Sequence, residues 1–332
     1  MLENKDLDTY AVLVHYGEDE QALFSGNADP YTYFDIASMG KVLITSTLIL
    51  QAIGRGLLRL ESTIGDFFDI ADAQKQKITV RQMLTHTSGI LRKPITEEAA
   101  RKGSDEIARL MLSYPLGFAP GTDCVYSCNP YILLGYILEK IYGCSLEEVY
   151  KKNIAEPLGL HRSEFEIALN EENAAVCYRW KDTPKQRYDS DRVLIMGKPA
   201  GSGGQQSCLQ DIQKFITAVL DKSEILYPER FYEMAETNHT PDFGESKGLG
   251  YFLVNETFSQ TGKLFPKGSF GHTGHTGQSF FINREKQLYV IILTNATRFS
   301  FVKNDFKKYN YEDIKKMREE IHNAIYADLF GA

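Results

Sequence analysis

Ser38 and Lys41 stand three residues apart at the start of residues 40–53, an apolar segment typical of a helix buried on all sides. On a helix, side chains at i and i+3 share a face, so the Lys41 amine would lie beside the Ser38 hydroxyl. Free N–H groups at the helix N-terminus suit a developing oxyanion, and burial lowers the pKa of a lysine so that it can accept a proton. The pair could be a nucleophile with its base. The alternative of a helix-capping Ser38 and a solvated Lys41 stays open from this motif alone.

Two other serines match nucleophile motifs in an unsuitable context. Ser300 and Lys303 repeat the Ser-x-x-Lys spacing, but a polar stretch follows them instead of an apolar helix. Ser246 stands in Gly-Glu-Ser-Lys-Gly, which matches the nucleophile elbow of α/β-hydrolases. That elbow needs a strand before it and a helix after it, whereas a strand-like run, 249–254, follows here. We expect neither serine to be the nucleophile.

Two downstream segments carry groups that could assist a serine. Tyr126 stands in Val-Tyr-Ser-Cys-Asn, and a phenol near a lysine cation can have its pKa pulled down from about 10 and act as a general base. His272-Thr273-Gly274 stands in the glycine-rich run 271–277, where a substrate could lie against the backbone and a free N–H could complete an oxyanion hole. Taken alone, the first could be a core aromatic residue and the second an ordinary turn.

In this order, the three motifs resemble the serine β-lactamase and penicillin-binding-protein superfamily. The resemblance is closest to class C β-lactamases, β-lactamase-like carboxylesterases, and DD- and D-amino peptidases. It extends over nearly the whole chain through further matching segments: 84–89 (LTHTSG), 120–122 (PGT), 133–135 (LLG), 157–160 (PLGL) and 200–204 (AGSGG).

The resemblance implies that Ser38 is the acylated nucleophile and that Lys41 and Tyr126 transfer its protons. The backbone N–H groups of Ser38 and His275 would form the oxyanion hole. His86 falls in a motif that looks structural, and neither a metal nor an organic cofactor is implied. The substrate-facing residues would be His272, Thr273, Gly274, Cys128 and Asn129.

Two departures from the family pattern bear on the substrate. Cys128 stands where the Tyr-x-Asn motif has asparagine, so an amide that holds the substrate is missing. An alternative register makes Ser127-Cys128-Asn129 a Ser-x-Asn motif, but the spacing from residues 120–122 favours Tyr126 and leaves Asn129 chiefly as a helix cap. His272 stands where the family often has lysine, and a neutral imidazole attracts a β-lactam carboxylate less strongly.

Several elements must position these residues. A hairpin is predicted at 10–16 and 21–24, a helix over 131–141 after Asn129-Pro130, and strands at 251–254, 279–282 and 288–294. Ile314, Met317, Ile321 and Ile325 predict an amphipathic helix, and 168–192 an exposed loop.

We therefore expect an α/β (α+β) fold of the β-lactamase/transpeptidase type, an antiparallel sheet flanked by helices. The sheet domain would comprise residues 1–60 and 200–332. A mostly helical insertion would comprise residues 61–199, with the active site in the cleft between the two.

Composition limits the partners and the cellular compartment that we expect for this protein. The 332 residues are 43% hydrophobic and carry a net charge of −7 without a Lys/Arg block, which excludes a nucleic-acid partner. The start of the chain lacks the pattern of a secretion signal, and residues 42–53 are too short to span a bilayer. Five scattered cysteines favour free thiols, and Cys124 and Cys128 lack a second ligand pair for zinc. We expect a cytoplasmic protein.

The favoured activity is that of an esterase, amidase or D-amino-acid peptidase acting on a small-molecule or short-peptide substrate. A true β-lactamase or DD-carboxypeptidase is the first alternative. A binding protein without catalysis on the same fold is the second.

Overall fold

The computed structural model describes residues 9–165, 174–175, 195–297 and 311–331. Six of the described strands form one sheet in the order β2-β1-β8-β7-β6-β5, and every neighbouring pair is antiparallel. β3 (Phe34–Asp35) and β4 (Gln206–Ser207) form a separate small ladder. The strands of the sheet are β1 (Tyr10–Tyr16), β2 (Asp19–Ser25), β5 (Phe252–Leu253), β6 (Phe270–Thr273), β7 (Ser279–Asn283) and β8 (Leu288–Thr294).

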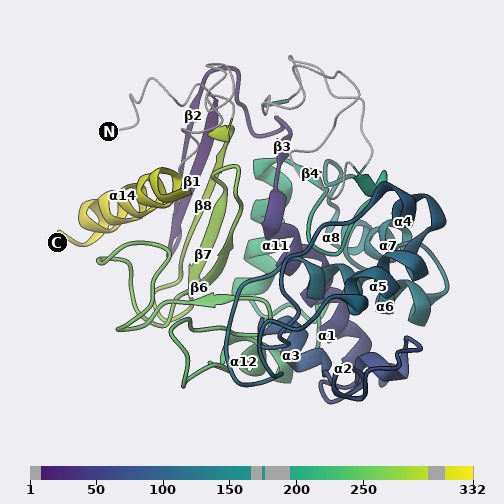
Figure 1. Cartoon of the computed structure of the whole chain (residues 1–332). Helices are drawn as coiled ribbons and strands as arrows, with labels where there is room; N and C mark the ends of the chain where they lie inside the picture. Colours follow the sequence, from purple (N-terminus) through teal and green to yellow (C-terminus); the bar gives the residue numbers. More distant parts are fainter. Residues whose placement is uncertain (1–8, 166–173, 176–194, 298–310, 332) are drawn as a thin grey trace.

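The sheet joins the two ends of the sequence, as predicted. β1 pairs with β8 over its whole length, with Tyr10 opposite Thr294 and Tyr16 opposite Leu288. The hairpin of β1 and β2 confirms the prediction for residues 10–24. The antiparallel sheet with helices on both sides confirms the predicted fold class (Figure 1).

Both faces of the sheet are covered. Side chains alternate between the faces along a strand, and all seven residues of β8 are buried. Ile291 and Leu293 join the apolar core that includes α11, whereas Val290 and Ile292 join a second cluster with Ile321 of α14. Figure 1 accordingly shows α14 and α11 on opposite sides of the sheet.

The described α-helices cluster on the α11 side of the sheet, with α14 as the exception (Figure 1). One apolar core runs through α1, α6 and α11, and thus through both predicted units, whose boundaries stay a prediction. The α-helices are α1 (Thr47–Gly54), α2 (Ala73–Gln76), α3 (Val80–Leu84), α4 (Glu97–Lys102), α5 (Ser104–Ser113), α6 (Asn129–Tyr142), α7 (Leu146–Tyr150), α8 (Glu156–Leu158), α11 (Leu209–Leu220), α12 (Arg230–Glu236) and α14 (Tyr311–Phe330).

Two helix predictions need correction. The segment 40–53 is not one regular helix, because a 3₁₀ turn (Ala37–Met39) and a π-helical turn (Lys41–Ser46) precede α1. Asn129 is not the cap of α6. The backbone of Cys128 is already helical (φ −81°, ψ −28°), so Asn129 is the first residue inside the helix and is fully buried. Gly143 ends α6 in the left-handed conformation.

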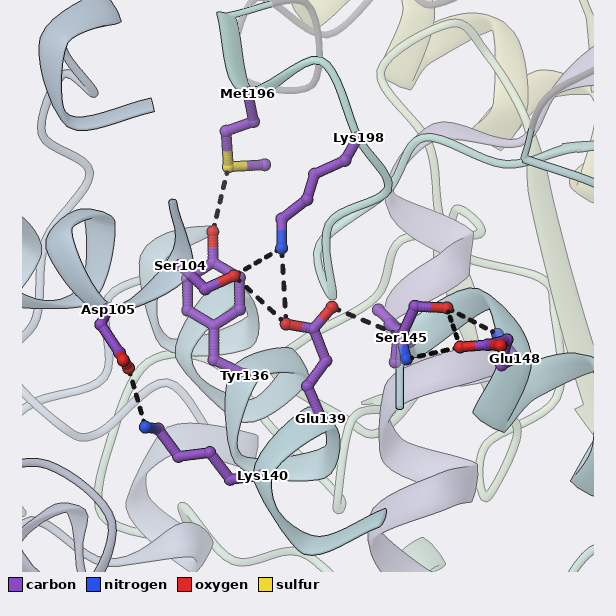
Figure 2. A network of polar contacts seen from close by, with 10 residues as sticks. Ser104, Asp105, Tyr136, Glu139, Lys140, Ser145, Glu148, Met196 and Lys198 are labelled. Carbon is purple, nitrogen blue, oxygen red and sulfur yellow. Dashed lines mark hydrogen bonds and ion pairs between the residues drawn. The ribbon is translucent and has the colours of Figure 1, made fainter. Parts of the chain in front are cut away.

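A polar network ties the helices to the chain that runs on to residues 200–204 (Figure 2). Lys198 Nζ donates to Ser104 Oγ at 2.5 Å and lies 3.4 Å from Glu139 Oε2. Ser104 Oγ donates to the same carboxylate at 3.3 Å, and the other Glu139 oxygen accepts the N–H of Leu146. These contacts fix Lys198 to α5, α6 and the start of α7.

Of the described segments, Ala37–Gly54 is long and apolar enough to cross a membrane. However, 83% of it is buried inside the fold, as in the core helix of a globular protein. The predicted loop 168–192, residues 174–175 apart, and the Ser300–Lys303 motif lie outside the described residues.

Candidate active site

Ser38 and Lys41 are in direct contact where β3 leads into the 3₁₀ turn. Lys41 Nζ donates to Ser38 Oγ at 2.9 Å and to the backbone oxygen of Ser202 at 3.0 Å. Lys41 is 0% exposed, whereas Ser38 is partly exposed. The amine predicted to lie beside the hydroxyl is therefore buried beneath a serine that solvent can reach.

The turn that carries Ser38 is strained and held from two sides. Ala37 has φ +47°, a left-handed conformation that a residue with a Cβ rarely adopts. A carboxylate oxygen of Asp35 accepts the N–H of Ala37 at 2.8 Å. Gly203 lies against the other side, where a Cβ would be 3.1 Å from the Ala37 oxygen. Strain kept in this way is typical of functional sites.

The loop between β6 and β7, which carries His275, is tied to the segment that leads to Ser38. Thr276 Oγ1 and Gln278 Nε2 both donate to the backbone oxygen of Asp35, at 3.1 Å and 2.6 Å. Neither Asp35 nor Gln278 stands in one of the motifs that are visible in the sequence. The structure thus brings together the two segments whose N–H groups were predicted to form the oxyanion hole.

Gly274 lies where this loop comes closest to the Ser38 turn. A Cβ on Gly274 would be 3.1 Å from the backbone oxygen of Ile36 and 3.2 Å from Cβ of Ala37. Arg318 of α14, which is fully buried, donates from Nη1 to the Gly274 oxygen at 3.0 Å. The close approach favours glycine here, and the arginine fixes the loop from the opposite side of the sheet.

Tyr126 lies on the other side of Lys41. The Nζ atom of Lys41 is 5.1 Å from the centroid of the Tyr126 ring, which is partly exposed. The His86 ring packs 4.6 Å from it, and His86 Nδ1 accepts the N–H of Ser127 at 3.3 Å. Burial holds the pKa of His86 well below its usual value, and Lys247 and Lys41 add to this. His86 is thus a neutral ring that supports Tyr126, in line with its predicted structural role.

His272 lies beneath the site. It is 1% exposed, and its ring centroid is 6.1 Å from that of Tyr126 and 4.7 Å from that of Phe252. Its Nδ1 accepts the N–H of Thr273 at 2.8 Å. Burial, followed by the charge of Lys41, holds the pKa of His272 well below its usual value, so the imidazole is neutral.

The other residues predicted to face the substrate differ in how far their side chains are buried. Cys128 is partly exposed, as Tyr126 is, whereas Thr273, Gly274, Ser127 and Asn129 are buried. The side chains that reach solvent are therefore those of the Tyr126-x-Cys128 register. Those of the alternative register, Ser127-x-Asn129, lie inside the fold.

Lys247 is a second buried lysine beside Tyr126 that the sequence analysis did not single out. Its ammonium is 5.7 Å from the Tyr126 ring centroid. The neighbouring Ser246 is buried and accepts a hydrogen bond from Asn255 Nδ2 at 2.5 Å. Strand β5 follows it instead of a helix, so the elbow expected of an α/β-hydrolase is absent here, as predicted. The position of Lys247 just before an apolar run is only a weak signal in the sequence that this lysine lies near Tyr126.

The described residues contain no group of three His, Cys, Asp or Glu side chains placed to hold a metal ion. Cys124 is buried, and its thiol contacts the Thr85 oxygen at 3.5 Å.

The Beta-lactamase family matches the chain over residues 6–309. The chain belongs to this family. The predicted superfamily is confirmed, and the narrower assignment to class C stays a prediction.

Relatives of this Beta-lactamase-family protein include esterases and peptidases. It is 25% identical to Esterase EstB of Burkholderia gladioli, a match that covers 89% of this chain and 87% of that protein. It is 27% identical to a putative D-alanyl-D-alanine carboxypeptidase of Escherichia coli (strain K12), with 80% of this chain and 69% of that protein covered. These names are those of hydrolytic enzymes, so the expectation of a serine hydrolase is confirmed at the level of the family.

A solved structure confirms the fold of the Beta-lactamase-family chain. EstCE1, described as a hydrolase with promiscuous acyltransferase activity, superposes with a TM-score of 0.71 at 18% identity. The match covers 94% of each chain.

Proposed function

We propose that the protein hydrolyses an ester or amide through an acyl-Ser38 intermediate. The observation that carries the proposal is the 2.9 Å contact between the Ser38 hydroxyl and the fully buried amine of Lys41. A hydroxyl is a weak nucleophile until a neighbouring base accepts its proton as the new bond forms. Lys41 supplies that base, and Tyr126 lies next to Lys41 to share or pass on the proton.

Acylation begins when Ser38 Oγ attacks the carbonyl carbon of the substrate and its proton passes to Lys41 and Tyr126. The carbonyl oxygen becomes an oxyanion, which the backbone N–H groups of Ser38 and His275 stabilise. The tetrahedral intermediate then collapses. The bond to the alcohol or amine breaks, the leaving group takes the proton from the Tyr126–Lys41 pair, and the acyl group stays on Ser38.

Deacylation repeats these steps with water as the nucleophile. Tyr126 and Lys41 accept a proton from the water as its oxygen attacks the acyl carbonyl. Collapse returns a proton to Ser38 Oγ and releases the carboxylic acid. The same pair thus serves as base and then as acid in each half of the reaction.

We infer that an ester, amide or D-amino-acid peptide is a better substrate than a β-lactam. His272 is a neutral, buried imidazole, so it offers no charge to a substrate carboxylate. Cys128 reaches solvent at the position where an amide side chain would hold the substrate amide. The likeness to an esterase over most of that protein's length supports this order. The likeness to a D-alanyl-D-alanine carboxypeptidase makes cleavage of a D-amino-acid peptide the second candidate.

Covalent labelling tests the proposal. The wild type, Ser38→Ala and Ser104→Ala would each be treated with a fluorophosphonate probe, and the adduct located by peptide mass. Ser104 is the matched control because it too contacts a lysine amine. We expect an adduct on the Ser38 peptide in the wild type and in Ser104→Ala, and none in Ser38→Ala. A folded wild type without an adduct on Ser38 would overturn the proposal.

The substrate class needs a separate comparison of rates. A short-chain nitrophenyl ester, a D-alanine anilide and a chromogenic cephalosporin would be assayed with the wild type and Ser38→Ala. We expect the ester or the anilide to be cleaved faster than the cephalosporin in a Ser38-dependent manner. The opposite order would show that the site prefers β-lactams.

A further inference from the structure

Lys247 is a buried charge that the proposed reaction does not use. It lies just before β5, opposite Phe252 in an isolated β-bridge, and its side chain is 2% exposed. Its N–H donates to Thr240 Oγ1 at 2.9 Å, and its carbonyl accepts the N–H of His239 at 2.8 Å. The backbone of Lys247 is therefore fixed on both sides.

The ammonium of Lys247 is directed at a group of aromatic rings that includes Tyr126. Its Nζ lies 3.6 Å from the centroid of Phe252, 5.5 Å from that of Phe258 and 5.7 Å from that of Tyr126. The Phe252 ring is nearly parallel to that of Tyr126, with centroids 6.0 Å apart. Rings attract a cation through their electron-rich faces, which holds the ammonium in this position.

Glu245 is the acidic partner of Lys247. Its Oε2 lies 2.5 Å from Lys247 Nζ, and its side chain is 38% exposed. Burial lowers the pKa of Lys247, and Glu245 opposes this shift. The contact with Glu245 therefore favours the charged ammonium.

The other titratable groups packed around Tyr126 and Lys247 are Lys41, His86, His272, Tyr131 and Cys124. Burial holds the pKa of both histidines well below the usual value. Burial also raises the pKa of the Tyr131 phenol, and that of the Cys124 thiol to about 11. These four groups are thus neutral near pH 7. Among the described residues, Lys41 and Lys247 are the lysines whose Nζ atoms lie close to the Tyr126 ring, 5.1 Å and 5.7 Å from its centroid.

We propose that Lys247 is a positioning residue that stabilises the anionic form of Tyr126 and thereby sets the pH range in which Tyr126 accepts a proton. A cation near an acid favours its charged form. Lys41 must itself exchange protons with Ser38 during the reaction, so its charge changes from step to step. Lys247 does not contact Ser38 in the described structure, so it takes no part in that proton exchange, and its contact with Glu245 favours the charged form beside the ring. The inference rests on the proposed role of Tyr126 as a proton acceptor.

Carbon-13 NMR of protein labelled at the Cζ atom of tyrosine tests this inference without any turnover. The Tyr126 signal is the one lost in Tyr126→Phe, and its chemical shift reports ionisation of the phenol as the pH is raised. In Lys247→Met we expect the pKa of Tyr126 to rise by about one to two units. In Lys247→Arg, which keeps the cation, it should stay near the wild-type value.

Lys75 provides a matched control. It is also a buried lysine with an acidic partner, since it lies 3.3 Å from Asp72 and donates to the Leu112 oxygen at 2.8 Å. Lys75→Met should lower the melting temperature but leave the Tyr126 titration unchanged. If Lys247→Met does not fold, Lys247→Gln replaces it as the neutral variant.

The pH dependence of ester hydrolysis supplies the second readout. The acidic limb of the kcat/KM profile should move to higher pH in Lys247→Met by the same shift as the NMR titration. A Tyr126 titration that is unchanged in a folded neutral variant would overturn the inference, and a loss of melting temperature alone would indicate a structural role. Failure of the proposed function would instead appear as missing fluorophosphonate labelling of Ser38 in the wild type.

Discussion

In the described part of the chain, two contacts between a serine hydroxyl and a lysine amine can be compared, and their surroundings differ. Ser38 and Lys41 meet at 2.9 Å within one strained turn. Ser104 and Lys198 meet at 2.5 Å between α5 and the chain before residue 200 (Figure 2). The first lysine is fully buried, whereas the second is 34% exposed and lies next to the Glu139 carboxylate.

The difference shows that a serine–lysine contact does not by itself make a nucleophile. At Ser104 the carboxylate accepts from both the hydroxyl and the ammonium, so the three groups form a structural tie. At Ser38 the amine contacts the hydroxyl and a backbone carbonyl, and a loop with further N–H groups packs against the same turn. Of the two, only the arrangement at Ser38 offers the proposed base together with a place for an oxyanion.

Exchange of each lysine for methionine gives the largest contrast. Lys41→Met should lower kcat/KM for the ester by about 10³- to 10⁴-fold, because the Ser38 proton loses its acceptor. Lys198→Met, which removes a comparable contact, should change it less than about tenfold, because it only loosens the helical network. Steady-state kinetics of the two folded variants measure the contrast, and equal losses would show that the two contacts are equivalent.

The two carboxylates that support these contacts give the next contrast. Asp35→Ala removes the acceptor for Ala37 N–H, so the strained turn can relax and kcat should fall by about 10- to 100-fold. Glu139→Gln should cost about 1–2 kcal/mol of unfolding free energy and leave kcat near the wild-type value. Kinetics and urea denaturation of both variants separate the effects. A normal kcat in Asp35→Ala would show that the turn does not depend on this carboxylate.

Lowering the pH should destabilise the part of the fold around Ser38 more than the helical network around Ser104. His86 and His272 lie beside Tyr126, and both have a pKa held well below 6.5 mainly by burial. The unfolded chain binds protons on these side chains near pH 6.5, whereas the folded chain does not. The stability that these histidines contribute is therefore full above pH 6.5 and falls as the pH drops below it.

The contribution of His322 on α14 to stability changes with pH in the same direction. Burial lowers its pKa to about 3, so its share of stability declines from pH 6.5 down to that value. Urea denaturation at pH 5 and pH 8 measures the sum, and amide hydrogen exchange locates it. We expect faster exchange at pH 5 in β6 and α14 than in α5 and α6. Equal stability at the two pH values would contradict this assignment.

The smallest effect is expected at the control serine. Ser104→Ala removes one hydroxyl from a partly buried network and should cost about 1 kcal/mol in a thermal or chemical melt. Ester hydrolysis should be unchanged. A loss of activity comparable to that of Ser38→Ala would remove the distinction between the two contacts.

The sequence predicted the elements whose pattern is local. β8 reads as an unbroken apolar run because it is buried on both faces in the middle of the sheet. The hairpin of β1 and β2 and the apolar stripe on α14 could be predicted in the same way. The start of the Ser38 helix was not, because its turn geometry depends on Asp35 and Gly203, which contact it from β3 and from a distant loop.

The same distinction applies to the site. The Lys41–Ser38 contact could be predicted because it spans three residues on one turn. Lys247 could not, because its proximity to Tyr126 depends on how β5 packs against the loop before α6. The error at Asn129 arose because Asn-Pro is a common helix opening, whereas here the backbone turns helical one residue earlier.

The pairing of β1 with β8 also governs when the site can form during synthesis. Ser38 and Lys41 leave the ribosome early, but the loop with His275 and strand β8 follow more than two hundred residues later. Contacts between such distant segments form slowly, after shorter-range structure is in place. A nascent chain therefore carries Ser38 without the opposing loop of His275 until the sheet closes. The proposed site is thus among the last parts of the fold to be assembled.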